Sequence, residues 1–143
     1  MVDLLRDAPL GFLLVQVAKS HRRWVSTALD ELGLHVGQEL LLAQLCRQEG
    51  VRQTALAEAL GVELPTVHKT LARLEAAGFV ERRPDPQDAR SSLAYLTVRG
   101  RETCVQIRKI WEDADRRLCS MMSPDDAARL RDLLKQLVDR LNA

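Results

Sequence analysis

Residues 51–100 read VRQTALAEALGVELPTVHKTLARLEAAGFVERRPDPQDARSSLAYLTVRG, and this stretch decides the fold. Its first part predicts a short helix in which Leu56 and Leu60, four residues apart, face inward. Gly61 ends that helix, because glycine adopts the positive φ that a tight turn requires. A second helix follows over about residues 64–77. Two short helices joined by a tight turn predict a helix-turn-helix unit, whose second helix can enter the major groove of DNA.

The second helix has two different faces. Val67, Leu71 and Leu74 recur at helical spacing and predict the buried side. The remaining positions face outward and are polar: Thr66, His68, Lys69 and Arg73. These side chains offer donors to base edges and phosphates, and Arg73 is the best candidate for bidentate recognition of guanine.

Two strand-like runs follow this unit, at residues 79–83 and 93–97. The segment between them, PDPQDARSS, is rich in turn-forming residues and predicts a hairpin with a long tip. From that tip Arg90 can reach into a minor groove, where a narrow width concentrates negative potential. Asp88, two residues earlier, is placed to orient the Arg90 guanidinium. A hairpin directly after a helix-turn-helix unit is a wing, so the order of elements predicts a winged helix.

Amphipathic helices are predicted on both sides of the winged unit. Residues 9–32 carry apolar side chains at three- and four-residue steps and precede Gly33, and another helix follows. After the wing, residues 102–121 predict a long helix. Ser123 opens the last helix, with Pro124 and two aspartates in its first turn, where a capping hydroxyl and carboxylates are favourable.

The whole pattern predicts a mainly α fold with a small β-hairpin wing, in a sheet of two or three strands. We divide the chain into residues 1–34, a winged helix-turn-helix unit at residues 35–100, and residues 101–143. The last helix carries a stripe of apolar residues: Leu130, Leu133, Leu134, Leu137, Val138 and Leu141. A monomer does not explain such a stripe far from the winged core. We therefore expect the terminal helices to form a two-fold homodimer interface.

The stretch ERRPDPQDARSSLAYLTVRG resembles the wing signature of the MarR (multiple antibiotic resistance regulator) family. That signature is an aspartate, one residue and an arginine, then Leu-Thr and a glycine, which here are Asp88, Arg90, Leu96, Thr97 and Gly100. The likeness extends over the whole chain and includes the Ser-Pro-acidic opening of the last helix. The resemblance implies a winged helix-turn-helix flanked by dimerisation helices.

Carried over by position, the resemblance also implies which residues approach DNA. His68, Lys69 and Arg73 would face the major groove, Arg90 would enter the minor groove, and Gln53 and Thr54 would approach phosphates. The full set of expected DNA-binding residues is Gln53, Thr54, Pro65, Thr66, His68, Lys69, Arg73, Arg83, Asp88, Arg90 and Ser91. We expect a homodimeric, sequence-specific regulator of double-stranded DNA, acting as a repressor on a pseudo-palindromic operator.

Small-molecule control is a further implication of the resemblance, which places an effector pocket between the dimer helices and the winged unit. Phe12, His21, Trp24 and Trp111 are candidates for its lining, although aromatics on helical stripes are more often core or interface. The effector would release the protein from its operator. Its identity is not contained in the residues.

Each DNA-binding residue also has a plain structural interpretation. The formal net charge is only +1, and acidic residues balance the basic ones around the winged unit. His68, Lys69 and Arg83 are equally compatible with a solvated surface, and Asp88 with Arg90 could be a turn-stabilising ion pair worth about 0–1 kcal/mol. The alternative function is a winged helix that binds another protein. Such a protein would not need both outward-facing arginines, Arg73 and Arg90.

The three cysteines raise a second alternative, a thiol-based redox-sensing regulator. Some members of the family use a cysteine in the N-terminal helix, but here none precedes Cys46. Cys46 falls on an apolar stripe and is expected to be inert core. Cys104 and Cys119 lie 15 residues apart on one helix, about 22 Å at 1.5 Å per residue, so a bridge would have to join two subunits. No local cluster of cysteine and histidine predicts a metal site.

Other classes of protein find little support. Glycine-rich phosphate loops, nucleophile elbows and His-Glu metal helices are missing from the sequence, so we expect neither enzymatic activity nor a cofactor. The apolar stretch at residues 9–15 is shorter than the roughly 18 residues of a membrane span. The charged start, with Asp3, Arg6 and Asp7, does not resemble a signal peptide. We therefore expect a cytoplasmic protein.

Overall fold

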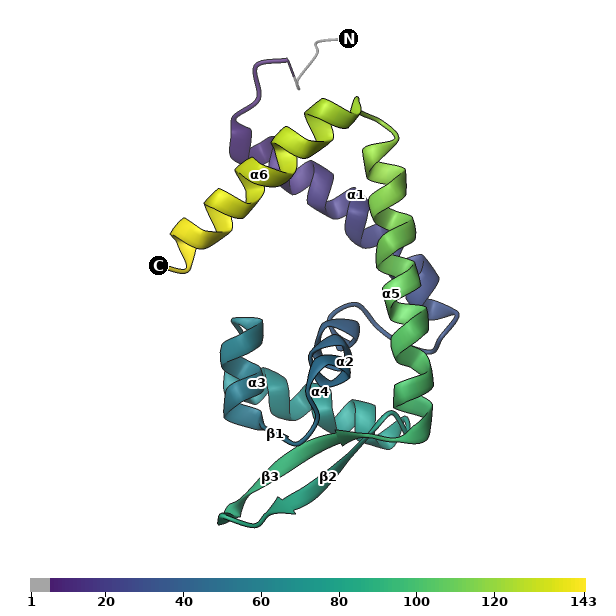
Figure 1. Ribbon diagram of the computed structural model, residues 1–143, viewed down its shortest axis with the longest axis vertical. Coiled ribbons are helices and arrows are strands. Elements are labelled where there is room, and N and C mark those ends of the chain that lie inside the picture. The colour runs from purple at the N-terminus through teal and green to yellow at the C-terminus, as the bar shows by residue number, and fades with distance from the viewer. Residues whose placement is uncertain (1–5) are drawn as a thin grey trace.

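The computed structural model of the chain describes residues 6–143; residues 1–5, with Asp3 of the N-terminal charge pattern, lie outside the described residues. Figure 1 shows helices above and below, joined by one long helix, with a small sheet at the lower end. The elements in chain order are α1 (Leu10–Asp30), α2 (Gln38–Arg47), β1 (Val51–Arg52), α3 (Gln53–Leu60), α4 (Leu64–Ala76), β2 (Val80–Asp85), β3 (Asp88–Leu96), α5 (Val98–Cys119) and α6 (Pro124–Leu141). The predicted winged-helix fold class is confirmed.

The sheet has three antiparallel strands in the order β1-β3-β2. Two details of the prediction were wrong. Residues 51–52, expected to begin a helix, form strand β1, because Val51 pairs with Ala94 far along the chain. The expected long hairpin tip is short: the two strands continue through most of PDPQDARSS and leave only Pro86 and Gln87 between them.

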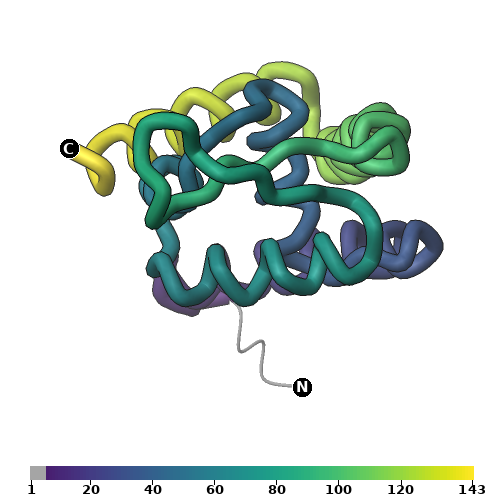
Figure 2. The backbone as a smooth tube through the Cα atoms, turned by 90° about the horizontal axis from the view of Figure 1, so that it is seen from below, coloured from purple at the N-terminus to yellow at the C-terminus, as the bar shows by residue number. Residues whose placement is uncertain are grey.

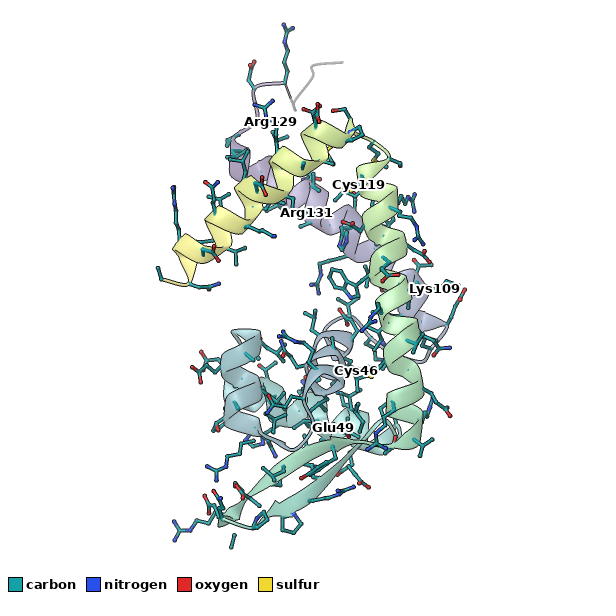
Figure 3. All side chains as sticks on the ribbon, viewed as in Figure 1. Cys46, Glu49, Lys109, Cys119, Arg129 and Arg131 are labelled. Atoms are coloured by element: carbon teal, nitrogen blue, oxygen red, sulfur yellow. A yellow bond between two sulfur atoms is a disulfide. The ribbon has the colours of Figure 1, made fainter. Side chains whose placement is uncertain are left out.

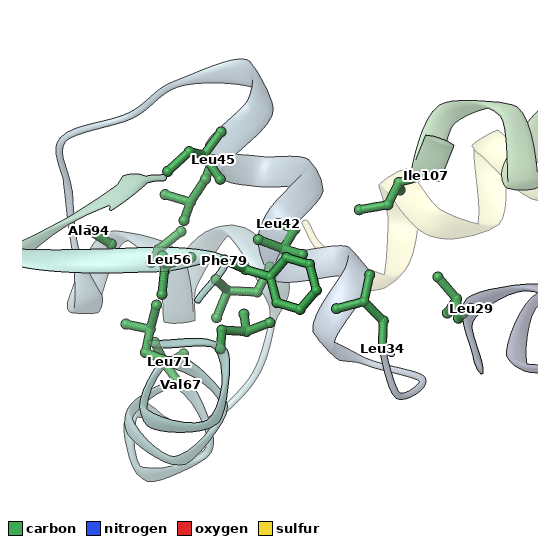
Figure 4. Packing of buried hydrophobic residues seen from close by; sticks show 14 of the residues in the cluster. Leu29, Leu34, Leu42, Leu45, Leu56, Val67, Leu71, Phe79, Ala94 and Ile107 are labelled. Carbon is green, nitrogen blue, oxygen red and sulfur yellow. The ribbon is translucent and has the colours of Figure 1, made fainter. Parts of the chain in front are cut away.

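The hydrophobic core lies between α2, α3, α4 and the sheet (Figure 4). Leu56, Leu71 and Phe79 are each at most 1% exposed, and burying such side chains stabilises the fold by roughly 1.5–3 kcal/mol apiece. Leu29 of α1 and Ile107 of α5 extend the same cluster toward the upper helices. The core therefore fixes the orientation of α4 and places the wing beside it.

The junction between the wing and α5 shows the structural roles of Thr97 and Gly100, two residues of the wing signature. Thr97 caps α5: its Oγ1 accepts a hydrogen bond from Gly100 N at 3.1 Å and donates one to Gly78 O at 2.6 Å. A Cβ added at Gly100 would overlap the carbonyl oxygen of Phe79, so only glycine fits. α5 begins at Val98, earlier than the predicted 102, because the helix starts at this cap.

α5 rises from the wing to the two terminal helices (Figure 1). Ser123 Oγ accepts a hydrogen bond from Asp126 N at 3.1 Å and caps α6, as the sequence predicts. α6 buries none of its residues within the chain. None of the helices among the described residues is long and apolar enough to span a membrane.

The cysteines differ from the prediction. Cys46 was expected to be inert core, but it is exposed and forms a disulfide with Cys104, which joins α2 to α5. The two cysteines are 58 residues apart in sequence, so only the packing of the two helices brings them together. Cys119 is the remaining free cysteine among residues 6–143 and lies at the far end of α5.

Candidate nucleic-acid interface

Helix α4 presents one polar face outward. Val67, Leu71 and Leu74 are fully buried, and the other side of the helix is exposed at Thr66, His68, Lys69 and Arg73. Pro65 stands in the first turn of α4, where its missing N–H removes no helical hydrogen bond. The helix is thereby anchored by its leucines and free to offer its polar side to a groove.

A concave surface lies between the start of α3, the start of α4 and the wing. Figure 2 looks onto this side of the molecule, where α4 and the β2–β3 hairpin lie along opposite edges. The hollow measures about 520 Å³ and is lined by Arg52, Gln53, Thr54, Leu64, His68, Asp88, Arg90, Ser91 and Ser92. Six of the eleven expected DNA-binding residues are thus brought together in one surface.

Asp85 organises the wing from below this surface. Its carboxylate is 3% exposed and accepts hydrogen bonds from Gln87 N at 2.9 Å, Arg52 Nε at 2.7 Å and Ser91 Oγ at 3.0 Å. The bond from the Gln87 backbone, then those from Ser91 and Arg52, hold the pKa of Asp85 below its ordinary value, although burial opposes them. The wing tip is therefore tied to the start of α3, and Arg52 is held at the edge of the hollow.

Two further hydrogen bonds shape the same surface. Gln53 Nε2 donates to Ser92 Oγ at 2.9 Å, which links α3 to β3. Asp88 Oδ1 accepts a hydrogen bond from the backbone N of Arg90 at 2.9 Å. Asp88 therefore shapes the turn, while within residues 6–143 the Arg90 guanidinium forms no ion pair and is exposed.

Five of the expected residues lie outside the hollow: Pro65, Thr66, Lys69, Arg73 and Arg83. Thr66 and Arg73 line a smaller one of about 230 Å³, between α4 and the start of α2. Arg83 forms an ion pair with Glu81, and its guanidinium lies 4.1 Å over the ring of Tyr95. Glu81 neutralises Arg83, which stands apart from the concave surface.

Several acidic residues of the winged unit form ion pairs with basic residues inside the unit. Asp85 pairs with Arg52, and Glu75 of α4 pairs with Arg82 of β2 at 2.9 Å. The side-chain hydrogen bond from Arg82 holds the pKa of Glu75 below its ordinary value. These acids hold the unit together, whereas Lys69, Arg73 and Arg90 form no ion pair with any described residue. These three cations are exposed and free to contact a ligand.

Comparison with known proteins agrees with this geometry. A family model described as the MarR family matches residues 32–91. An HTH-type transcriptional repressor of Mycobacterium tuberculosis is 32% identical over 136 residues, which cover 95% of this chain and 98% of the relative. The multiple antibiotic resistance protein MarR of Escherichia coli is 30% identical over 138 residues, covering 95% and 96%. The chain belongs to the MarR family. It is a DNA-binding transcriptional regulator and not an enzyme.

A solved structure shows the same fold in a more distant protein. MepR of Staphylococcus aureus, crystallised as a complex with DNA, superposes with a TM-score of 0.86 at 22% identity, over 94% of this chain and 99% of that one. The arrangement of helix-turn-helix, wing and terminal helices is therefore that of the MarR fold.

Three of the four expected effector-pocket residues come together in this MarR-family chain. The ring of His21 lies 5.2 Å from that of Trp111 and 6.4 Å from that of Trp24, while the Arg117 guanidinium lies 4.2 Å over Trp24. Phe12 is exposed further toward the start of α1. Trp111 also lines a hollow of about 570 Å³ between α2 and α5.

Arg52, Asp85 and Ser92 belong to the candidate interface in the structure but are not indicated by the sequence. The sequence predicts residues 51–52 to be helical, and this hides the place of Arg52 beside the wing. The segment PDPQDAR offers two aspartates, and nothing local tells which one is buried. The pairing of β1 with β3 would have shown it, since that pairing brings Arg52 to Asp85.

Proposed function

We propose that this MarR-family protein is a homodimeric repressor that binds a pseudo-palindromic operator and leaves it when a small effector binds. The observation that carries the proposal is the concave surface between α4 and the wing, which Arg90 lines, together with the exposed face of α4 that carries Lys69 and Arg73. A polar helix face with cations on one side of the molecule is the electrostatic pattern of a groove-binding protein.

In this proposal each element has its own contact. α4 enters the major groove, which admits a helix, and Arg73 reads a guanine edge. Arg90 at the wing inserts into the adjacent minor groove. Arg52 and Thr54, at the start of α3, donate hydrogen bonds to phosphates and fix the register. Asp85 positions the wing tip, on which Arg90 depends.

Dimerisation is supported by the terminal helices. Large apolar side chains are exposed on both helices: Leu133, Leu137 and Leu141 on α6, and Phe12 and Val17 on α1. A second copy that covers both faces would remove them from water. We assign residues 1–34 and 101–143 to pairing and residues 35–100 to DNA. The two-fold axis then presents two α4 helices to half-sites about 10 to 10.5 base pairs apart.

Effector control is supported by the hollow of about 570 Å³ between α2 and α5, which is lined mainly by apolar side chains. A ligand there would separate the winged unit from α5 and change the distance between the two α4 helices, which favours release. We place the protein in the cytoplasm, together with its DNA.

The test is a titration of the purified protein on the duplex upstream of its own reading frame, with an unrelated duplex of equal length as reference. Arg90→Ala should weaken binding to both duplexes, because one cation is lost from the minor groove. The slope of log affinity against log salt concentration should fall by about 1. Arg73→Ala should cost about 1–3 kcal/mol at one base position and leave other positions unchanged.

Lys109→Ala is the matched control. Lys109 lies on the outer side of α5, away from the wing (Figure 3), and its removal takes away the same unit of charge. Equal affinities for Lys109→Ala, Arg90→Ala and Arg73→Ala would contradict the assigned interface. Equal weak binding of the unchanged protein to both duplexes would favour the protein-binding winged helix instead.

A further inference from the structure

A covalent bond joins the two halves of the molecule. Cys46, in the last turn of α2, forms a disulfide with Cys104 in α5, with their Cα atoms 6.0 Å apart. α2 packs in the core of the winged unit through Leu41, Leu42 and Leu45, whereas α5 continues upward to α6. The bond therefore crosses the joint through which any movement of the winged unit relative to α5 must pass.

A second, non-covalent link lies beside the first. Three residues after Cys46, the Glu49 carboxylate accepts a hydrogen bond from Arg101, three residues before Cys104, with Nη2 and Oε1 3.0 Å apart. Glu49 also accepts a hydrogen bond from the backbone N of Leu96 at 2.8 Å, the main reason that its pKa lies below the ordinary value. Without the disulfide, this partly exposed ion pair and the packing of Ile107 in the core would still hold the same two segments.

The disulfide is accessible from solvent. Cys46 is exposed and Cys104 is half-buried (Figure 3 labels Cys46 beside α5). Both sulfur-bearing residues line the hollow between α2 and α5, and Arg47 and Arg108 line it with them. The thiolate is the form of a cysteine that reacts with peroxides. A small peroxide or thiol can reach Cys46 without unfolding the chain.

We propose that Cys46 and Cys104 form a reversible redox pair that locks the winged unit to α5 and so sets operator affinity. The inference rests on the proposed function, since it adds a second input to the same regulator. Disulfides in the cytoplasm are rare and, where present, mostly transient or redox-sensing, which is consistent with an exposed, reducible pair.

The chemistry balances with a hydroperoxide as oxidant. The Cys46 thiolate attacks the peroxide, the O–O bond breaks, and Cys46 becomes a sulfenic acid while an alcohol leaves. The Cys104 sulfur then attacks the sulfenic sulfur, an S–S bond forms, and water leaves. Two thiols and one hydroperoxide give one disulfide, one alcohol and one water. In the reverse direction a dithiol is oxidised to its own disulfide, and both cysteines are restored as thiols.

The oxidised form binds the operator more tightly. With the disulfide in place, the winged unit has fewer orientations relative to α5, so less conformational freedom is lost when two units fit one duplex. After reduction, the Glu49–Arg101 pair, the Thr97 cap and the packing of Ile107 still hold the joint, but without a covalent bond between α2 and α5. We expect a roughly three- to tenfold weaker operator affinity for the reduced protein, and faster amide exchange in α2 and the first turns of α5.

The experiment compares the full chain reduced with dithiothreitol and oxidised with tert-butyl hydroperoxide, each freed of excess reagent. Thiol titration should find three thiols in the reduced protein and one in the oxidised protein, because the chain has three cysteines. Peptide mass mapping should place the bond between Cys46 and Cys104. Operator affinity and amide exchange are then measured on both forms.

Two variants separate the pair from the third cysteine. Cys46→Ser with Cys104→Ser should bind the operator like the reduced protein and ignore the peroxide. Cys119→Ser is the matched control and should keep the full response, because Cys119 lies at the other end of α5.

Each failure has its own signature. Failure of peroxide to form the bond, or operator affinity that is equal in the two states or tighter in the reduced one, overturns the inference while the regulator stands. Loss of duplex preference in both states overturns the proposed function and the redox control of DNA with it. Amide exchange, which needs no DNA, would still tell whether the bond locks the joint.

Discussion

The winged unit and the terminal helices satisfy their side chains in opposite ways. In the winged unit most leucines are buried, and acids such as Asp85 and Glu75 have internal basic partners. In α6 the apolar side chains are exposed and no residue is buried. One chain is therefore enough to bury the core of the winged unit, whereas the exposed apolar face of α6 would be covered only in the proposed dimer.

The largest expected effect comes from breaking the terminal half. Leu133→Glu with Leu137→Glu places two charges on the exposed apolar face of α6, where pairing would bury them at high cost. We expect a monomer by light scattering and a loss of operator affinity of about 10³-fold or more, toward non-specific binding. Gln136→Glu, on the same helix, is the control and should remain dimeric. A double variant that stays dimeric would show that α6 is not the interface.

A core truncation tests the other side of the comparison. Leu71→Ala, in the fully buried row of α4, should lower the free energy of unfolding by about 2–5 kcal/mol through lost burial and a cavity. Leu141→Ala, 83% exposed at the end of α6 in one chain, should change it by about 0.5 kcal/mol or less when measured in the monomeric Leu133→Glu, Leu137→Glu variant, where no second chain covers it. Denaturant unfolding at one protein concentration measures both. Similar losses would mean that the terminal helix is packed as tightly as the winged core.

Reducing the Cys46–Cys104 disulfide loosens the link between the two halves. The bond closes a loop across a sequence separation of 58 residues, and its removal should lower the free energy of unfolding by about 2–4 kcal/mol, mainly through the unfolded state. Denaturant unfolding with and without dithiothreitol gives the difference. The variant Cys46→Ser with Cys104→Ser should be insensitive to dithiothreitol; a persistent difference in that variant would point to Cys119.

The smallest expected effect is a pH dependence of the wing. The folded-state pKa of Asp85 lies below its ordinary value of 3.8, so its stabilisation is present above that value and is lost as pH falls through the lower, folded pKa. Asp85→Asn should therefore lower the unfolding midpoint at pH 7 but have a smaller effect at low pH. Ser91→Ala, which removes one of the three donors to Asp85, should show the same trend more weakly. A difference that does not change with pH would mean that Asp85 acts only by its shape.

The sequence predicts well what depends on near neighbours. The faces of α4, the turn at Gly61 and the cap at Ser123 follow from spacing within a few residues, and the structure has all three. The features that the sequence does not predict depend on residues that are distant along the chain. Strand β1 needs Ala94, the buried Asp85 needs Arg52, and the disulfide needs a cysteine 58 residues away. The exposed stripe of α6 is local, so the sequence could indicate that it lacks a cover within the chain.

The most direct measurement is the ratio of affinities for the upstream duplex and an unrelated duplex at one physiological salt concentration, with stoichiometry determined in the same titration. We predict that the upstream duplex binds at least about 10³-fold more tightly, with one dimer per site, as specific regulators do. Equal weak binding to the two duplexes, or one monomer per site, would contradict a dimeric DNA-binding surface formed by two copies of α4 and the wing.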